Sequence, residues 1–166
     1  MTKTARGFTL VELLVALAII GLLASIVLAS LNSARAKAED ARKSVIMQQY
    51  KLALDFIYQK TGGYPAPSTT GIYCIDVNPC GWNNGWPGDT TIATAFREFI
   101  SLPRLNPING ALGTFIGPAY NCTAITNGVC TSGDIRWFTD PSLGTCPGGT
   151  EALLTQNLLR CRYIFP

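Results

Sequence analysis

Histidine is absent from the 166 residues of this chain. Its absence removes the side chain that most often acts as a general base and as a metal ligand near neutral pH. A cysteine nucleophile would have no histidine to activate it, and the six cysteines do not form the closely spaced C-x-x-C pairs of zinc sites. We therefore expect that the protein is not an enzyme and carries no cofactor and no metal ion.

Charge is also scarce, with 13 basic and 10 acidic residues and a net charge of +3. So small an excess does not favour nucleic acid as the main partner. None of the charged residues falls within the 19-residue run 13–31. A helix over residues 8–31 would be about 36 Å long, which exceeds the roughly 30 Å hydrocarbon core of a bilayer. The sequence therefore predicts a membrane-spanning helix near the N-terminus.

Two simpler interpretations compete for this apolar run. Residues 34–36, Ala-Arg-Ala, resemble the cut site of a secretory signal peptide. However, the apolar region of such a signal is usually about 7–15 residues long, and the run here is longer. The other alternative is a plain single-pass membrane protein whose head binds a ligand. It would be favoured if the mature protein retained residues 1–7.

Glu12 lies near the start of the apolar segment and is its only charged residue. A carboxylate deep in a bilayer costs about 2.5–3.5 kcal/mol on insertion scales, so it needs either a position near the membrane surface or a cationic partner. Cleavage between Gly7 and Phe8 would create such a cation, a new amino terminus four residues before Glu12. In a stack of identical helices, Glu12 of one copy would pair with the Phe8 amine of the next, and we favour this interpretation.

The start of the chain also carries a family resemblance. A short leader with two basic residues, Lys3 and Arg6, precedes the sequence GFTLVE at residues 7–12 and the apolar run. This pattern resembles the prepilin cleavage motif of type IV pilins and pseudopilins. The resemblance extends over about residues 1–65. It implies that a prepilin peptidase removes residues 1–7 and that the amine of Phe8 is N-methylated.

The same resemblance implies a function and a set of partners. We expect a structural subunit of a type IV pilus-like extracellular filament, built by packing of the N-terminal helices of identical copies. The subunit would wait in the membrane, and a cytoplasmic ATPase with its platform protein would drive assembly. A pseudopilin of a type II secretion system and a competence pilin for DNA uptake share this N-terminal pattern, so both remain alternatives.

All six cysteines follow the apolar run. An even number of cysteines in a loop-rich segment predicts a disulfide framework and hence an oxidising compartment, whereas free thiols in a cytoplasmic chain are the alternative. We therefore expect a cytoplasmic N-terminus and a head outside, although four basic residues within 35–43 would favour the opposite orientation. The cysteines are Cys74, Cys80, Cys122, Cys130, Cys146 and Cys161.

Among the 15 connectivities that six cysteines allow, we choose pairing in sequence order. Each pair then encloses a turn-rich segment with Pro or Gly. The last loop also resembles the C-terminal disulfide-bounded region of pilins. The expected pairs are Cys74–Cys80, Cys122–Cys130 and Cys146–Cys161.

The N-terminal helix is expected to continue well beyond the membrane. Residues 34–60 lack Gly and Pro and are rich in helix formers, and the Gly62-Gly63 pair followed by Pro65 should end the helix. Apolar residues spaced by three, four and seven predict one face packed against the head. The predicted face contains Ala38, Ala41, Val45, Leu52 and Phe56, with Ile46, Tyr50, Ala53 and Ile57 beside them.

The predicted fold class is α+β and pilin-like, with the long helix packed on a small antiparallel sheet. Loops should dominate residues 66–133, with a short helix at 92–102. Strands are expected at 134–139 and 160–165, and less regularly at 114–120. We divide the chain into a leader at 1–7, a transmembrane or filament-core helix at 8–33, an amphipathic half-helix at 34–61 and a disulfide-rich head at 62–166.

Three weaker site signals lie in the head. Residues 121–123 fit the N-glycosylation pattern, but a disulfide cysteine in the centre makes this a poor candidate. Asp76, Asp89 and the Asn83-Asn84 pair could offer oxygens to calcium, although such a site needs six or more converging ligands. Three tryptophans could stack on a ligand, although tryptophan side chains more often pack in a core or a loop. They are Trp82, Trp86 and Trp137.

Overall fold

The structure is a computed structural model of the chain and describes residues 7–110, 113–139, 146, 149, 151–155 and 158–166. By its internal contacts the chain divides into two compact units, Met1–Glu39 and Asp40–Pro166. The helix α1 (Leu10–Thr61) contributes its first part to one unit and its second part to the other.

Local hydrogen bonds define both ends of α1. At the start, the Thr9 hydroxyl accepts from the Glu12 N–H at 3.3 Å, and the Glu12 carboxylate accepts from the Thr9 N–H at 2.8 Å. This reciprocal arrangement is a capping box. At the end, Gly62 adopts φ 74° and its N–H donates to the Tyr58 carbonyl at 2.8 Å. Because glycine takes the left-handed conformation at little cost, the helix stops where the sequence predicts.

The first part of α1 exposes its apolar side chains on all sides. From Phe8 to Leu31, the large apolar side chains are between 42% and 78% exposed. The helix contains a window with mean hydropathy 2.8, which is long and apolar enough to cross a membrane. A helix that is apolar all round needs lipid or protein around it. The predicted long apolar helix is therefore confirmed as an element of the fold.

The second part of α1 packs against the head through one face, on which Met47 and Leu54 are also buried. The positions predicted for this face divide into two groups. Ile46, Tyr50, Ala53 and Ile57 are buried, whereas Ala38, Ala41, Val45, Leu52 and Phe56 are exposed. The prediction was therefore wrong for the second group, whose five residues do not lie on the buried face. The helical period fits two apolar stripes on this helix, and only contact with the sheet decides which of them is covered.

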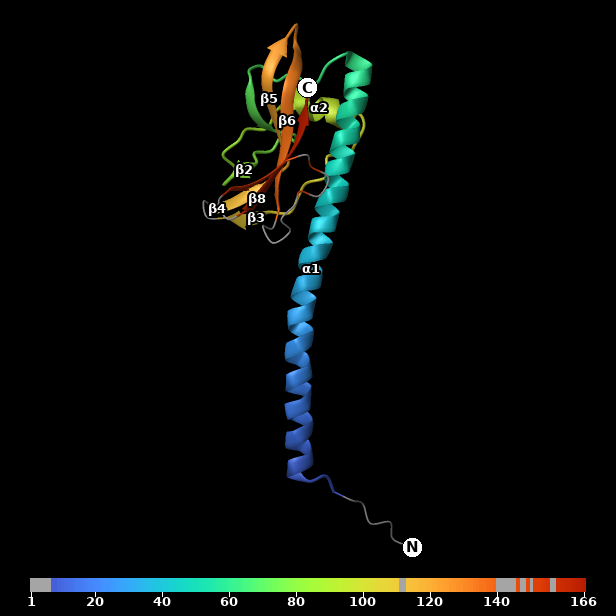
Figure 1. Ribbon diagram of the computed structural model, residues 1–166, viewed down its shortest axis with the longest axis vertical. Helices are drawn as coiled ribbons and strands as arrows, with labels where there is room; N and C mark the ends of the chain where they lie inside the picture. The colour runs from blue at the N-terminus through green and yellow to red at the C-terminus, as the bar shows by residue number, and fades with distance from the viewer. Residues whose placement is uncertain (1–6, 111–112, 140–145, 147–148, 150, 156–157) are drawn as a thin grey trace. The chain divides into compact units, whose positions relative to one another are not determined.

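Two antiparallel sheets and a short helix complete the head (Figure 1). The larger sheet has the order β1-β5-β6-β8-β7, with β1 at Gly71–Cys74, β5 at Ala119–Thr126, β6 at Val129–Thr139, β8 at Leu158–Phe165 and β7 at Glu151–Thr155. The smaller sheet has the order β2-β4-β3, with β2 at Gly81–Trp82, β4 at Gly113–Ile116 and β3 at Ile108–Gly110. The helix α2 spans Thr90–Arg97. The α+β fold class, with its long helix and antiparallel sheet, is thus confirmed.

The strand predictions were correct in part. The expected strands at 134–139 and 160–165 lie within β6 and β8. The expected strand at 114–120 is instead divided between β4 and β5, because Gly117 and Pro118 interrupt it. Proline has no N–H to donate to a ladder, so it lies outside both strands. β5 and the start of β6 also lie in the region where loops were expected to dominate.

The main core lies between the inner face of α1 and the larger sheet. Trp137 and Ile135 from β6, Tyr120 from β5 and Phe165 from β8 are at most 1% exposed. The ring of Tyr50 on α1 meets Phe96 of α2 edge-on, with centroids 5.7 Å apart. A core of this kind is close-packed, so it holds the second part of α1 in one register against the sheet.

Two charged side chains are buried where the head unit begins. Asp40 and Lys43 are 7% and 5% exposed, and their side chains lie 3.4 Å apart. The hydroxyl of Thr139, at the end of β6, donates to Asp40 at 2.6 Å. Buried charges are tolerated when they are paired and hydrogen-bonded. This contact therefore ties the helix to a strand 99 residues away in sequence.

Replacing Asp40 with Ala should destabilise the head, because it leaves the Lys43 ammonium buried without this partner. Removing one member of a buried pair typically costs about 3–5 kcal/mol. Denaturant unfolding of the full-length chain in detergent would measure the loss. The double variant Asp40→Ala/Lys43→Met is the control and should recover most of the stability. Equal stability of the single and double variants would contradict the prediction.

Candidate functional site

The residues of the N-terminal motif lie in the open at the start of α1. Gly7, Phe8 and Thr9 precede the helix without regular structure. A side-chain carbon added at Gly7 would meet no atom within 4 Å, and the Phe8 side chain is 78% exposed. Within the described residues of this unit, nothing shields the peptide bond between Gly7 and Phe8. An enzyme that cuts there would find the bond accessible.

Glu12 lies one helical turn after this bond, and its carboxylate has a partner within the chain. Oxygen Oε2 accepts from the N–H of Thr9 and is also 2.8 Å from the Thr9 hydroxyl. A carboxylate can accept about four hydrogen bonds, so Glu12 keeps capacity for a further donor through Oε1. Its negative charge also complements the partial positive charge at the N-terminus of the helix.

The sequence interpretation overlooked the role of Thr9. A Thr followed three residues later by Glu, just before an apolar run, is the signature of a capping box. The signal was present in residues 9–12 and could have been recognised. Glu12 therefore caps its own helix, a role that the sequence interpretation did not assign to it.

Three disulfides tie the loops and strands of the head together. Cys74 pairs with Cys80, Cys122 with Cys130, and Cys146 with Cys161. These are the pairs expected from the sequence. The paired residues are 6, 8 and 15 positions apart, respectively. Local crosslinks of this kind stabilise turn-rich segments, mainly by restricting the unfolded chain.

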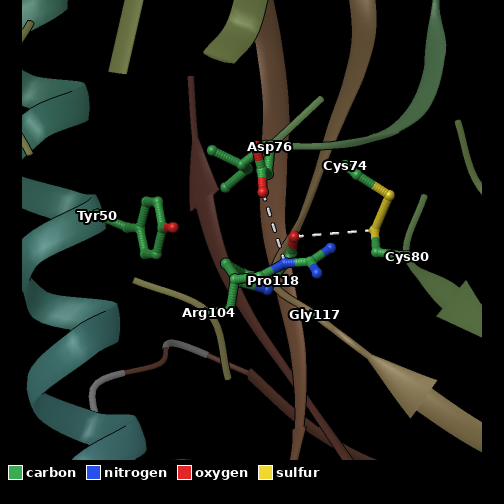
Figure 2. Close-up of a pocket in the computed structure, with 8 residues that line it drawn as sticks. Tyr50, Cys74, Asp76, Cys80, Arg104, Gly117 and Pro118 are labelled. Carbon is green, nitrogen blue, oxygen red and sulfur yellow. Dashed lines mark hydrogen bonds and ion pairs between the residues drawn. A yellow bond between two sulfur atoms is a disulfide. The ribbon is translucent and has the colours of Figure 1, made fainter. Parts of the chain in front are cut away.

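The loop closed by Cys74–Cys80 is held to the rest of the head through Asp76. Figure 2 shows the Asp76 carboxylate directed toward Arg104, beside the disulfide. Asp76 Oδ2 lies 3.6 Å from Arg104 Nε, and Asp76 Oδ1 accepts from Arg97 Nη2 of α2 at 2.9 Å. The hollow beside it has a volume of about 10 Å³, enough for one water molecule. The cluster is therefore a structural tie, with no room for a ligand.

The surroundings of Asp76 set its protonation. Partial burial raises the pKa of the Asp76 carboxyl, but hydrogen bonds from Asn78 and the Val77 N–H and the charges of Arg104 and Arg97 outweigh it. The net result is a pKa below the ordinary value. Nearby, burial raises the pKa of Tyr50, whose neutral hydroxyl donates to the Pro103 carbonyl at 2.9 Å.

The structure assigns local partners to Asp76, Asn83 and Asp89, three of the four residues considered for calcium. Asp89 caps α2 by accepting from the Ile92 N–H at 2.9 Å, and Asn83 Oδ1 accepts from the Thr114 N–H at 3.2 Å. Asp76 forms ion pairs with Arg97 and Arg104. Among the described residues, no group of three or more His, Cys, Asp or Glu side chains is arranged to hold a metal ion.

The remaining weak signals also resolve into packing. Asn121 is 6% exposed and donates to Asp134 at 2.8 Å, so it is a poor acceptor for a glycan. Trp137 is fully buried, and Trp82 and Trp86 both meet Phe115 edge-on. Trp137 therefore belongs to the interior of the head, and Trp82 and Trp86 pack half-buried against it at Phe115.

Comparison with known families identifies the N-terminal unit. Residues 2–28 match the prokaryotic N-terminal methylation motif. This chain therefore carries the signature of type IV pilins and pseudopilins, and the resemblance noted in the sequence is confirmed. The motif indicates a structural subunit, and together with the apolar helix it fits a membrane-anchored precursor. No curated protein and no solved structure matches the chain.

Replacing Asp76 with Asn should lower the free energy of unfolding and alter its dependence on pH. Because the folded pKa lies below the unfolded value of about 3.9, Asp76 stabilises the head fully above that pH. This contribution is lost as the pH falls through the folded pKa. Unfolding of both proteins from pH 7 to pH 2 should therefore give curves that differ at neutral pH and converge in acid. Parallel curves over the whole range would refute the assignment.

Proposed function

We propose that this chain is the precursor of a structural subunit of a type IV pilus-like extracellular filament. The observation that carries the proposal is the methylation motif at the start of a helix with exposed apolar side chains. Such a helix must be covered on all sides. Lipid covers it before assembly, and the helices of identical copies cover it in the filament.

Processing would occur at the accessible bond between Gly7 and Phe8. A prepilin peptidase removes the leader, residues 1–7, and the new amine of Phe8 is methylated. The helix 8–33 then serves first as membrane anchor and later as filament core, while 34–61 joins it to the head at 62–166. The three disulfides support a head outside the cytoplasm, because such crosslinks persist in oxidising compartments.

Glu12 would set the register between neighbouring copies. In the single chain its carboxylate is bonded to Thr9 through Oε2. In the filament, Oε1 accepts from the Phe8 amine of the next copy, so the capping box is retained while the charge gains a partner. In an apolar environment, such a pair forms only when the two helices lie at one particular displacement.

The machinery and the closest alternatives follow from the same N-terminal unit. Moving the helix from lipid into the filament requires work, which a cytoplasmic ATPase and its platform protein would supply. Pseudopilins of type II secretion systems and competence pilins share the motif. They differ in the length and abundance of the fibre, so electron microscopy of sheared surface filaments separates them from a pilus.

The mature protein should begin at a methylated Phe8. Intact-mass measurement of the membrane and filament fractions, with sequencing of the N-terminal peptide, would check this. A mature chain that keeps Met1 would favour a plain membrane anchor, and one that begins at Lys37 would favour a secretory signal. Either result would overturn the proposed function.

Glu12→Gln should separate capping from charge pairing. Glutamine also serves in a capping box, so the helix start should persist while the negative charge is lost. We expect normal membrane insertion and cleavage. Filament yield should fall by about tenfold or more, because truncating one partner of a desolvated charge pair costs at least about 2 kcal/mol. Thr9→Ala is the matched control, which weakens the cap and keeps the charge. Normal filament yield from Glu12→Gln would contradict the pairing.

A further inference from the structure

The dipeptide Asn-Gly occurs three times in the head, at residues 84–85, 109–110 and 127–128. This dipeptide is open to a spontaneous reaction, in which the backbone nitrogen of the glycine attacks the side-chain amide carbon of the asparagine. Glycine allows the attack because it has no Cβ and its backbone is little restricted. Since the reacting residues are the same in all three pairs, the fold around them decides which pair reacts.

Two of the three pairs are held by hydrogen bonds at a reacting group. In the first pair, the Gly85 N–H donates to the Trp82 carbonyl at 2.8 Å, so the attacking nitrogen is engaged. In the second pair, Asn109 lies in β3 opposite Thr114 of β4, and its side-chain oxygen accepts from the Thr114 hydroxyl at 2.8 Å. The reaction at either pair therefore has to break a hydrogen bond first.

The third pair forms the two-residue turn between β5 and β6. Asn127 and Gly128 have φ values of 51° and 78°, which are the positive values typical of a tight hairpin turn, and Thr126 pairs directly with Val129. Both turn residues are exposed, and a Cβ added at Gly128 would meet no atom within 4 Å. Within the part of the chain that the structure describes, no hydrogen bond holds the Gly128 N–H or the Asn127 side chain.

We propose that Asn127 is a site of spontaneous deamidation in the folded protein. The Gly128 nitrogen loses its proton to solvent and bonds to Cγ of Asn127, while the bond between Cγ and Nδ2 breaks and ammonia leaves. Water then opens the succinimide ring that results. Opening at Cγ gives aspartate, and opening at the main-chain carbonyl gives isoaspartate, whose backbone runs through the former side chain. Water is consumed and ammonia is released, with no oxidation or reduction.

The reactive turn lies next to the contact that holds the segment after α1. A Cβ added at Gly63 would lie 2.5 Å from Cβ of Val129, so the segment and the hairpin touch closely there. Tyr64 and Cys130 exchange two backbone hydrogen bonds, of 3.2 and 3.0 Å. Isoaspartate lengthens the backbone of the turn and disturbs the register that the turn sets. Aspartate adds only a negative charge, so the two products should differ in their effect on this contact.

Peptide mapping of the full-length chain in detergent tests the site. The chain is kept folded in mildly alkaline buffer, and a second sample is kept reduced and denatured. Fragment spectra of tryptic peptides then locate each converted asparagine. In the folded chain, Asn127 should convert about tenfold faster than Asn84 or Asn109, because a hydrogen bond that must first break can account for such a factor. In the denatured chain the three rates should be similar. Equal rates in the folded chain, or a faster rate at Asn84 or Asn109, would overturn the proposal.

Two matched variants test whether this turn is the source of the new charge. Asn127→Gly removes the reacting amide and keeps a residue that accepts positive φ. Asn84→Gly is the control, because Asn84 is also exposed and has φ 59°. The first acidic species that ion-exchange chromatography separates from the folded chain should be absent from Asn127→Gly and present in Asn84→Gly. Acidic species that form equally fast in both variants would refute the site.

Hydrogen exchange tests the effect of isoaspartate on the neighbouring contact. The isoaspartate form, isolated from aged protein, is compared with the variant Asn127→Asp, which has the same charge and a normal backbone. The N–H groups of Tyr64 and Cys130 should exchange about tenfold faster in the isoaspartate form, because the turn no longer sets the register of their hydrogen bonds. Equal exchange in the two proteins would contradict the expected loosening.

Discussion

The apolar surface of α1 must be kept out of water. Its first part exposes large side chains on every side, and no element in the described part of its unit covers them. The free energy gained by burying apolar surface is roughly proportional to the area removed from water. A helix of this length therefore has a strong tendency to remain in lipid or among other helices. Under the proposed function, the helix passes from lipid to other helices, and both surroundings keep its apolar surface out of water.

The head holds the second part of α1 in a fixed register, and it does so with a modest core. The buried face around Tyr50 and Leu54 packs on the larger sheet. The contact between Asp40 and Thr139 and the tie between Asp76 and its two arginines add directional restraints. Disulfides restrict the turn-rich loops. Among the described residues, the head packs on one face of the second part of α1. The opposite face, with Val45 and Leu52, stays exposed.

Under the proposed function, Glu12 would be stable in two settings. Through Oε2 it completes the capping box with Thr9, so the carboxylate is hydrogen-bonded while the subunit is alone. An incoming amine does not need to break these bonds, because the second oxygen can accept it. Capping and pairing are therefore compatible rather than competing uses of the same group.

The sequence by itself determined the features that depend on residues close together: the N-terminal methylation motif, the uncharged run, the end of α1 at Gly62 and the local cysteine pairs. The tertiary structure decided which of two apolar stripes on α1 faces the sheet, because both satisfy the same helical period. It also decided that β4 and β5 separate at Gly117-Pro118 and that Asp40 meets Thr139. Contacts across 99 residues depend on how sheet and helix pack together, and no local pattern in either segment specifies the other.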